Sequence, residues 1–245
     1  MEKLSKKIDP NSPFFRIFAA DELIENMTRK LVIFDLDGTL LNTYADIAAA
    51  TNHALTLHGY PNHSVEVIRS FVGNGINKLF ERALPEGHKA QEEVLAIRAD
   101  FVPYYNAHGT EKTFVFDGMR ELIDRLTAEG VKVAVASNKY QEATRHLIPY
   151  FFPGVNFSAI FGQRDGIPTK PDPQIVYDIM RESGIEDARE VLYVGDSEVD
   201  METAHNAGVD GVGVTWGCKT RELLASHKPY AIVDRAEEIL PLLNR

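Results

Sequence analysis

A short apolar run followed at once by an acidic turn constrains this chain more than any other feature. Residues 31–34 are Leu-Val-Ile-Phe, a pattern typical of a β-strand that is covered on both faces in a parallel sheet. The next residues are Asp35-Leu36-Asp37-Gly38-Thr39. In open α/β sheets, ligands bind beyond the carboxyl ends of the strands. The two carboxylates therefore mark a candidate site at that edge.

A hairpin turn at Asp37-Gly38 is the alternative interpretation, because Asp-Gly is common in two-residue hairpin loops. That interpretation needs a second strand after Thr39. From Ala45 onward the sequence is instead rich in alanine and helical in pattern. We therefore favour a strand that leads through an acidic turn into a helix.

Further apolar runs alternate with helical patterns in the second half of the chain. The predicted strands are 131–136, 159–161, 191–194 and 211–214, with a further edge strand at 230–233. The predicted helices are 118–129, 139–148, 172–184, 198–207, 219–227 and 235–243. Strands that alternate with helices in this way predict an α/β fold with a doubly wound parallel sheet.

Residues 44–110 interrupt this alternation with helical patterns alone. The predicted helices here are 44–58, 64–71, 76–84 and 88–107. The block is too long for a strand-to-helix connection, so we expect an inserted helical subdomain at 44–110 and a core formed by 28–43 and 111–245. Residues 1–27 are polar and broken by prolines, which predicts a leader or flexible extension; an amphipathic helix over 14–24 that docks on the body is the alternative.

Composition excludes several other classes. The chain has 26 Lys and Arg against 36 Asp and Glu, a net charge of −10, which disfavours binding to nucleic acid. No apolar run approaches the roughly 20 residues needed to cross a bilayer. Cys218 is the one cysteine of the sequence, so no internal disulfide can form and a reducing compartment is expected. We expect a cytoplasmic protein, a monomer or weak homodimer, that binds neither nucleic acid nor membranes.

Polar residues also follow the other predicted strands. Ser137-Asn138 follow 131–136, Gly195-Asp196-Ser197 follow 191–194 with Asp200 three residues beyond, and Lys170 lies in a proline-flanked loop after 159–161. Each has an ordinary explanation: a helix cap, a capping box of Ser197 with Asp200, or an exposed loop lysine. Independent capping does not explain why all of them fall at the same end of one sheet.

The order and spacing of these residues resemble the haloacid dehalogenase superfamily over residues 28–240. Asp35-x-Asp37-Gly38-Thr39 matches its first motif, Ser137 its second, Lys170 its third and Gly195-Asp196-x-x-x-Asp200 its fourth. The helical insertion is similar to the C1-type cap of that superfamily, whose core is Rossmann-like. Within it, residues 72–84 are similar to the cap loop and helix of phosphoglycolate phosphatases.

This resemblance implies a Mg²⁺-dependent phosphatase that forms an aspartyl-phosphate on a small phosphorylated metabolite, with 2-phosphoglycolate favoured. Asp35 would be the nucleophile, because an ionised carboxylate needs no base to attack phosphorus. Asp37 would act as general acid and then as general base, and Lys170 would neutralise charge on the phosphoryl group. The implied Mg²⁺ ligands are Asp35, the Asp37 carbonyl, Asp196 and, through water, Asp200, which is alternatively a partner of Lys170.

The resemblance also implies which residues bind substrate. Ser137, Lys170 and the backbone near Gly38 and Asn138 would hold the phosphoryl group, and Thr39 would orient Asp37. In the cap loop, Gly73 and Asn74 would face the active site, with Asn74 or nearby Lys78 meeting the distal group of the substrate. A plain helix–helix connector is the alternative for this loop.

Five alternatives compete with this interpretation. A β-phosphoglucomutase is disfavoured because no histidine lies between Thr39 and Ala50, where its cap-linker histidine is expected. Dehalogenation is disfavoured because dehalogenases lack the second aspartate of the first motif. Pyrophosphatase and nucleotidase activities stay open, as does a regulatory binding protein without turnover, although the intact motifs argue against the last.

Overall fold

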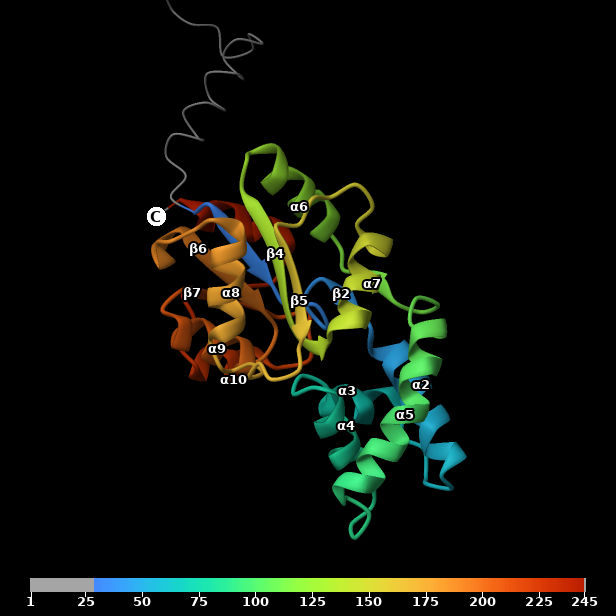
Figure 1. The fold of residues 1–245 in the computed structure, drawn as a ribbon. Coiled ribbons are helices and arrows are strands. Elements are labelled where there is room, and N and C mark those ends of the chain that lie inside the picture. Colours follow the sequence, from blue (N-terminus) through green and yellow to red (C-terminus); the bar gives the residue numbers. More distant parts are fainter. Residues whose placement is uncertain (1–28, 245) are drawn as a thin grey trace, which may run out of the picture.

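The computed structural model describes residues 29–244, so the prediction made for residues 1–27 lies outside the described part. Six parallel strands form one sheet in the order β5-β4-β1-β6-β7-β8 (Figure 1). Their bounds are β1 Leu31–Phe34, β4 Lys132–Tyr140, β5 Ala159–Gln163, β6 Val191–Gly195, β7 Asp210–Val214 and β8 Ala231–Val233. The predicted doubly wound α/β fold is confirmed.

The apolar strand β1 lies in the centre of the sheet, where a strand without polar residues belongs. All four of its side chains are completely buried. Phe34 is in register with Val135 of β4 on one side and with Val194 of β6 on the other. The residues that follow these three strands are therefore brought to the same edge of the sheet.

Helices cover both faces of this sheet. One face packs against α6 (Met119–Ala128), α7 (Gln141–Phe151) and the 3₁₀ helix η2 (Ala236–Leu243). The other face packs against α8 (Gln174–Ser183) and α9 (Glu198–Ala207). A short η1 (Ala188–Glu190) precedes β6, and α10 (Arg221–Ser226) packs against α9 and β7. Side chains alternate between the faces, as in β1, where Val32 and Phe34 face one layer and Leu31 and Ile33 the other.

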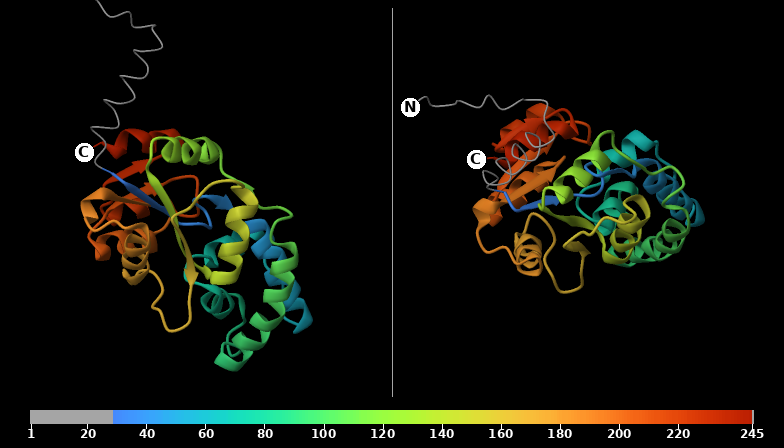
Figure 2. Two further views of the ribbon diagram at one scale, coloured as in Figure 1. Left: turned by 45° about the horizontal axis from the view of Figure 1, so that its top comes forward. Right: turned by 90° about the horizontal axis from the view of Figure 1, so that it is seen from above.

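The helical insert consists of α2 (Tyr44–Leu57), α3 (Val65–Phe71), α4 (Ile76–Ala83) and α5 (Gln91–His108). The long helices α2 and α5 pack along each other, and α4 packs on α5 through Phe80 and Phe101, whose rings meet edge to face at 5.5 Å. The insert lies at the carboxyl ends of β4 and β5 in Figure 1, and Figure 2 shows it beside the core in two further orientations. These helices begin and end within three residues of the predicted ranges.

The structure differs from the sequence prediction in some local features. Leu41–Asn42 (β2) pair antiparallel with Phe114–Val115 (β3), so the insert is entered and left through a two-stranded ribbon. A strand does follow Thr39, but it pairs with β3 and not with β1, so Asp37-Gly38 is no hairpin loop. The segment predicted as a helix at 235–243 is the 3₁₀ helix η2, which contains Pro241, a residue without an N–H for an α-helical bond.

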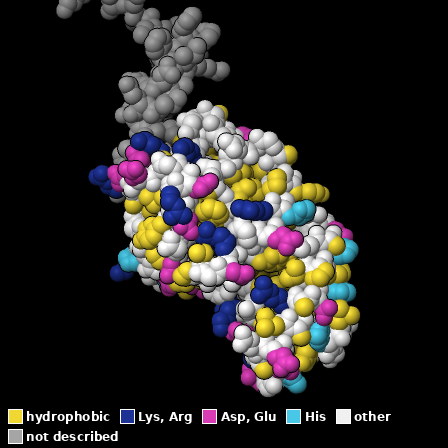
Figure 3. Space-filling view, in the orientation of Figure 1, with side chains coloured by type: hydrophobic (Ala, Val, Ile, Leu, Met, Phe, Trp, Pro, Cys, Tyr) yellow, Lys and Arg dark blue, Asp and Glu magenta, His cyan; other side chains and the backbone are white. Residues whose placement is uncertain are grey.

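Within residues 29–244, no helix is both long and apolar enough to span a membrane. On the face of the described part shown in Figure 3, Lys and Arg side chains are scattered among Asp and Glu and form no continuous basic surface.

Candidate active site

The acidic turn after β1 is held by its own backbone. The N–H of Asp35 donates to the Val194 carbonyl at 2.9 Å, which continues the sheet to the first aspartate. Gly38 has a φ of +93°, and a Cβ there would lie 2.1 Å from the Tyr44 hydroxyl oxygen, so glycine is required on both grounds. This tight turn places Asp37 on the same side of the sheet edge as Asp35.

Lys170 is buried among three acceptors. Its ammonium nitrogen lies 2.9 Å from Asp35 Oδ1, 2.7 Å from Asp200 Oδ1 and 3.0 Å from the Ala136 carbonyl oxygen. Burial alone would lower the pKa of Lys170, but the charges of Asp200 and Asp35 outweigh it and hold that pKa well above its ordinary value. Lys170 is therefore a fixed positive charge against Asp35, not an exposed loop lysine.

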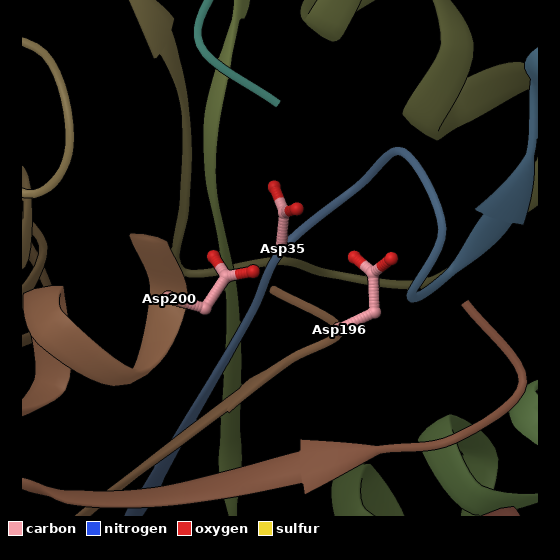
Figure 4. A group of neighbouring side chains, drawn as sticks. All are labelled: Asp35, Asp196 and Asp200. Carbon is pink, nitrogen blue, oxygen red and sulfur yellow. The ribbon is translucent and has the colours of Figure 1, made fainter. Parts of the chain in front are cut away.

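Three buried aspartates gather beside this lysine. Asp35, Asp196 and Asp200 each offer a carboxylate oxygen, and these oxygens lie within 4.8 Å of one another. In Figure 4 the three carboxyl groups point to the same side. Burial, together with the charge of Asp200, raises the pKa of Asp35 well above its ordinary value and that of Asp196 to about 6. Such a cluster fits a divalent cation with oxygen ligands, because a bound cation removes the mutual repulsion of the carboxylates.

Asp200 also forms a capping box with Ser197, which the sequence analysis gave as its alternative, structural role. The Ser197 Oγ accepts the N–H of Asp200, and Asp200 Oδ2 accepts the N–H and hydroxyl of Ser197 at 3.1 and 2.6 Å. Its other oxygen pairs with Lys170. The carboxylate thus caps α9 and faces the site at the same time.

The surroundings of Asp196 come largely from the loop after β7. The Cys218 N–H donates to Asp196 Oδ2 at 2.6 Å, and a Cβ on Gly217 would lie 2.1 Å from the Asp196 Cβ, so only glycine allows this approach. The Tyr44 hydroxyl donates to the same Oδ2 at 3.4 Å. Burial, followed by the charge of Asp196, raises the pKa of the Cys218 thiol, which leaves it a poor nucleophile.

Asp37 is oriented by two side chains that the sequence analysis did not assign to it. The Thr43 hydroxyl donates to Asp37 Oδ1 at 2.6 Å, and the Lys139 ammonium lies 3.1 Å from the same oxygen. Thr39, expected to orient Asp37, donates instead to Asp196 Oδ1 at 3.3 Å. The physical reason is the turn itself, which directs residue 39 toward β6 and returns the chain to Asp37 only at residue 43.

A pocket separates the acidic turn from the helical insert, and its cavity is about 50 Å³. Its polar wall is formed by Asp35, Asp37 and residues 137–140 at the end of β4. Its other wall is mainly apolar, formed by Ile47, Val72, Ile76, Leu79 and Phe101 with Gly73 and Gly75. Ser137 and Asn138 therefore lie in the site, as expected.

The loop between α3 and α4 meets the core through its backbone. The Asn138 side-chain nitrogen donates to the Gly73 carbonyl at 3.0 Å. Asn74 Oδ1 instead accepts a hydrogen bond from Arg82, and exposed Lys78 pairs with Glu81. The sequence analysis expected Asn74 or Lys78 to meet the distal group of the substrate. Neither residue is among the described residues that line the pocket.

A second contact joins the insert to the core. The Arg69 guanidinium on α3 donates to the Gly217 carbonyl and lies 5.1 Å from the centroid of the Tyr44 ring. Lys139 and Arg69 were missed by the sequence analysis. Lys139 directly follows Ser137-Asn138 and was within reach of that reasoning; nothing in the local pattern distinguishes Arg69 from other exposed helix arginines.

A comparison with known protein families identifies the family to which this chain belongs. Residues 32–214 match the family model described as haloacid dehalogenase-like hydrolase. The chain belongs to the haloacid dehalogenase-like hydrolase family. Because the matched segment spans every predicted motif, the expectation of a hydrolase of this family is confirmed.

Relatives within this hydrolase family cover almost the whole chain. A phosphoglycolate phosphatase of Pseudomonas fluorescens (strain Pf0-1) is 34% identical over 226 residues, covering 90% of this chain and 82% of the relative. One of Pectobacterium atrosepticum is 33% identical, covering 86% and 91%. The crystal structure of a predicted phosphoglycolate phosphatase from Haemophilus somnus is 30% identical, with a TM-score of 0.80 over 88% of this chain and 98% of that one.

Proposed function

We propose that this protein is a Mg²⁺-dependent phosphomonoester hydrolase that works through an aspartyl-phosphate on Asp35. One observation carries the proposal: Asp35 lies at a pocket, 2.9 Å from a buried lysine and within 4.8 Å of two further carboxylates. The arrangement combines a nucleophile, a fixed positive charge and a candidate cation site. These are the components that phosphoryl transfer requires.

The metal site would be built from oxygen atoms. Asp35, Asp196 and the Asp37 carbonyl would hold the ion, while Asp200, paired with Lys170, would act through water or by orienting the lysine. When bound, Mg²⁺ would neutralise the carboxylates and polarise the phosphoryl oxygens.

The chain's own residues account for the proton and bond changes. An Asp35 carboxylate oxygen forms a bond to phosphorus, the ester P–O bond breaks, and Asp37 gives its proton to the leaving alkoxide. Asp37 then takes a proton from the water that attacks phosphorus, which releases inorganic phosphate and restores Asp35. Lys170, paired with Asp35, would keep a fixed positive charge beside the phosphoryl group, and the Ser137 hydroxyl with the nearby backbone N–H groups would hold the phosphoryl oxygens.

The helical insert would serve as a cap that excludes water and selects the substrate. The cavity beside the acidic turn is small, about 50 Å³, which favours a small phosphoester over a nucleotide. The names of the relatives point to 2-phosphoglycolate. We propose 2-phosphoglycolate as the substrate.

A phosphoester screen tests this proposal. Purified protein is assayed with and without Mg²⁺ on 2-phosphoglycolate, hexose phosphates, nucleotides and pyrophosphate. We expect Mg²⁺-dependent release of phosphate, fastest from 2-phosphoglycolate, and no turnover by a folded Asp35→Asn variant. Wild-type protein that releases no phosphate from any ester would contradict the proposal and favour a binding role.

A further inference from the structure

Lys139 lines the pocket, and the proposed reaction gives it no role beyond its contact with Asp37. The Lys139 side chain, 6% exposed, places its ammonium 3.1 and 3.3 Å from the two oxygens of Asp37. The ammonium also lies 4.4 Å from the centroid of the Tyr105 ring on α5. Lys139 is thus held between the acidic turn of the core and a helix of the insert.

The two lysines differ in how fully they are engaged. Lys170 directs its ammonium at two carboxylates and a carbonyl. The described residues offer Lys139 a single carboxylate, so at least one of its three N–H donors stays available. Among the described residues that line the pocket, Lys139 carries the one positive charge.

The side chains of the opposite wall carry no charge and no polar group. Its side chains are Ile47, Val72, Ile76, Leu79 and Phe101. A second negative group on the substrate, in addition to the phosphoryl group, would lose its hydration next to these apolar side chains. Its burial would be unfavourable unless a positively charged group paired with it. Because the cavity is about 50 Å³ and is lined by both Asp35 and Lys139, a small ester with its phosphorus at Asp35 lies within reach of Lys139.

Tyr105, whose ring contacts the Lys139 ammonium, also carries a buried hydroxyl. The Tyr105 hydroxyl is buried and has no hydrogen-bond partner among residues 29–244. Buried polar groups in folded proteins are nearly always paired, so an orphan hydroxyl indicates a missing partner. An anionic oxygen bound beside Lys139 would supply one.

We propose that Lys139 binds a second anionic group of the substrate, a carboxylate close to the phosphoester, and so selects small phosphorylated acids. This proposal rests on the proposed function and adds the residue that recognises the carboxylate of the substrate. The substrate carboxylate would share the Lys139 ammonium with Asp37, so the acid is bound beside the general acid.

The competing role for Lys139 is to position Asp37 alone. A positioning residue alters the rate of every ester alike, because each needs the same general acid. A residue that binds the carboxylate alters only esters that carry one. The two roles are therefore distinguished by the ratio of the kcat/KM values for two substrates, and not by the rate with either substrate alone.

The test compares 2-phosphoglycolate with 2-hydroxyethyl phosphate, in which a hydroxymethyl group replaces the carboxylate. We measure kcat and KM for wild type, Lys139→Met, Lys139→Gln, Lys139→Arg and Tyr105→Phe, each checked by circular dichroism. We expect the preference for the acid, as a ratio of kcat/KM, to fall at least ~10-fold in the Met and Gln variants through a raised KM. The Arg variant keeps most of the preference, and Tyr105→Phe loses a smaller part. Lys89→Met, which removes a lysine paired with Glu86 on the insert surface, leaves the ratio unchanged.

The outcomes separate the two proposals. A wild type that hydrolyses both esters, with the same preference in Lys139→Met, overturns the role of Lys139 and leaves the phosphatase intact. If Lys139→Met does not fold, an unchanged preference in both Lys139→Gln and Tyr105→Phe has the same meaning. A wild type that hydrolyses neither ester with Mg²⁺ overturns the proposed function, and the role of Lys139 with it.

Discussion

The Asn138 side chain joins the Gly73 loop of the insert to the lysine of the core. Its amide nitrogen lies 3.0 Å from the Gly73 carbonyl oxygen and 3.1 Å from the Lys170 carbonyl oxygen, and its amide oxygen accepts the Lys170 N–H at 2.9 Å. The position of Lys170 and the closure of the insert over the pocket are therefore mechanically connected through one side chain.

Loss of this connection should affect both binding and chemistry. We expect Asn138→Ala to lower kcat/KM about 10- to 100-fold, because Lys170 loses its backbone support and the loop loses its contact. The control is Asn206→Ala, which removes an exposed amide from the carbonyl of the neighbouring Pro171 but touches nothing in the insert. Steady-state kinetics are measured for both variants; equal rates for the two would contradict this role.

Arg69 should act on the closure of the insert alone. Its contact with the Gly217 carbonyl joins α3 to the loop that supports Asp196. We expect Arg69→Met to raise KM roughly 3- to 10-fold with a smaller change in kcat. Without this contact, an arrangement in which the insert has moved away from the core becomes more populated. Arg125→Met, which breaks a surface pair with Glu129, serves as the matched control. An unaltered KM in Arg69→Met would show that this contact does not hold the insert closed.

The aspartate cluster should bind Mg²⁺ in the absence of substrate. At neutral pH we expect Mg²⁺ to raise the melting temperature of the wild type, since a ligand that binds only the folded state stabilises it. Asp196→Asn should lose most of that shift, and Asp124→Asn, an exposed change on α6, should keep it. EDTA should abolish turnover and Mg²⁺ restore it, while Ca²⁺ should stabilise the fold without supporting turnover. An equal shift in Asp196→Asn would place the metal elsewhere.

Asp178 provides a pH-dependent contribution to stability away from the site. Burial raises its pKa, but hydrogen bonds from Arg164, Gln174 and Arg181 together outweigh burial and hold the pKa below its ordinary value. A carboxyl group whose pKa is lower in the folded than in the unfolded protein stabilises the fold at pH values above the unfolded pKa. This contribution is lost as the pH falls through the folded pKa.

We therefore expect Asp178→Asn to lower the free energy of unfolding by about 1–2 kcal/mol at pH 7, and by progressively less below pH ~4. Urea unfolding of both proteins across this range measures the difference. A constant difference from pH 7 to the acid end would show that the charge of Asp178 contributes nothing.

The parts of the fold that were predictable are those with strong periodicity. β1 is apolar throughout because it is central, and the helices of the insert repeat their buried positions, as in α4, where Ile76, Leu79, Phe80 and Ala83 are buried. The ribbon of β2 and β3 was not predictable, since two-residue strands leave no period to detect.

The same distinction holds in the site. Asp35 and Asp196 directly follow β1 and β6, and Ser137 lies in the last part of β4, so the sheet itself brings these three together. The contact made by Thr43 depends instead on how the acidic turn folds back, a geometry that sequence spacing does not encode. The misassignment of Thr39 to Asp37 has this cause.

Trapping the covalent intermediate tests the central claim most directly. Enzyme turning over 2-phosphoglycolate with Mg²⁺ is quenched rapidly and reduced with borohydride, which converts an aspartyl-phosphate into homoserine. We predict homoserine at position 35 by peptide mass spectrometry, and none in Asp35→Asn or without substrate. An active enzyme that shows no homoserine, or shows it at another aspartate, would contradict the account.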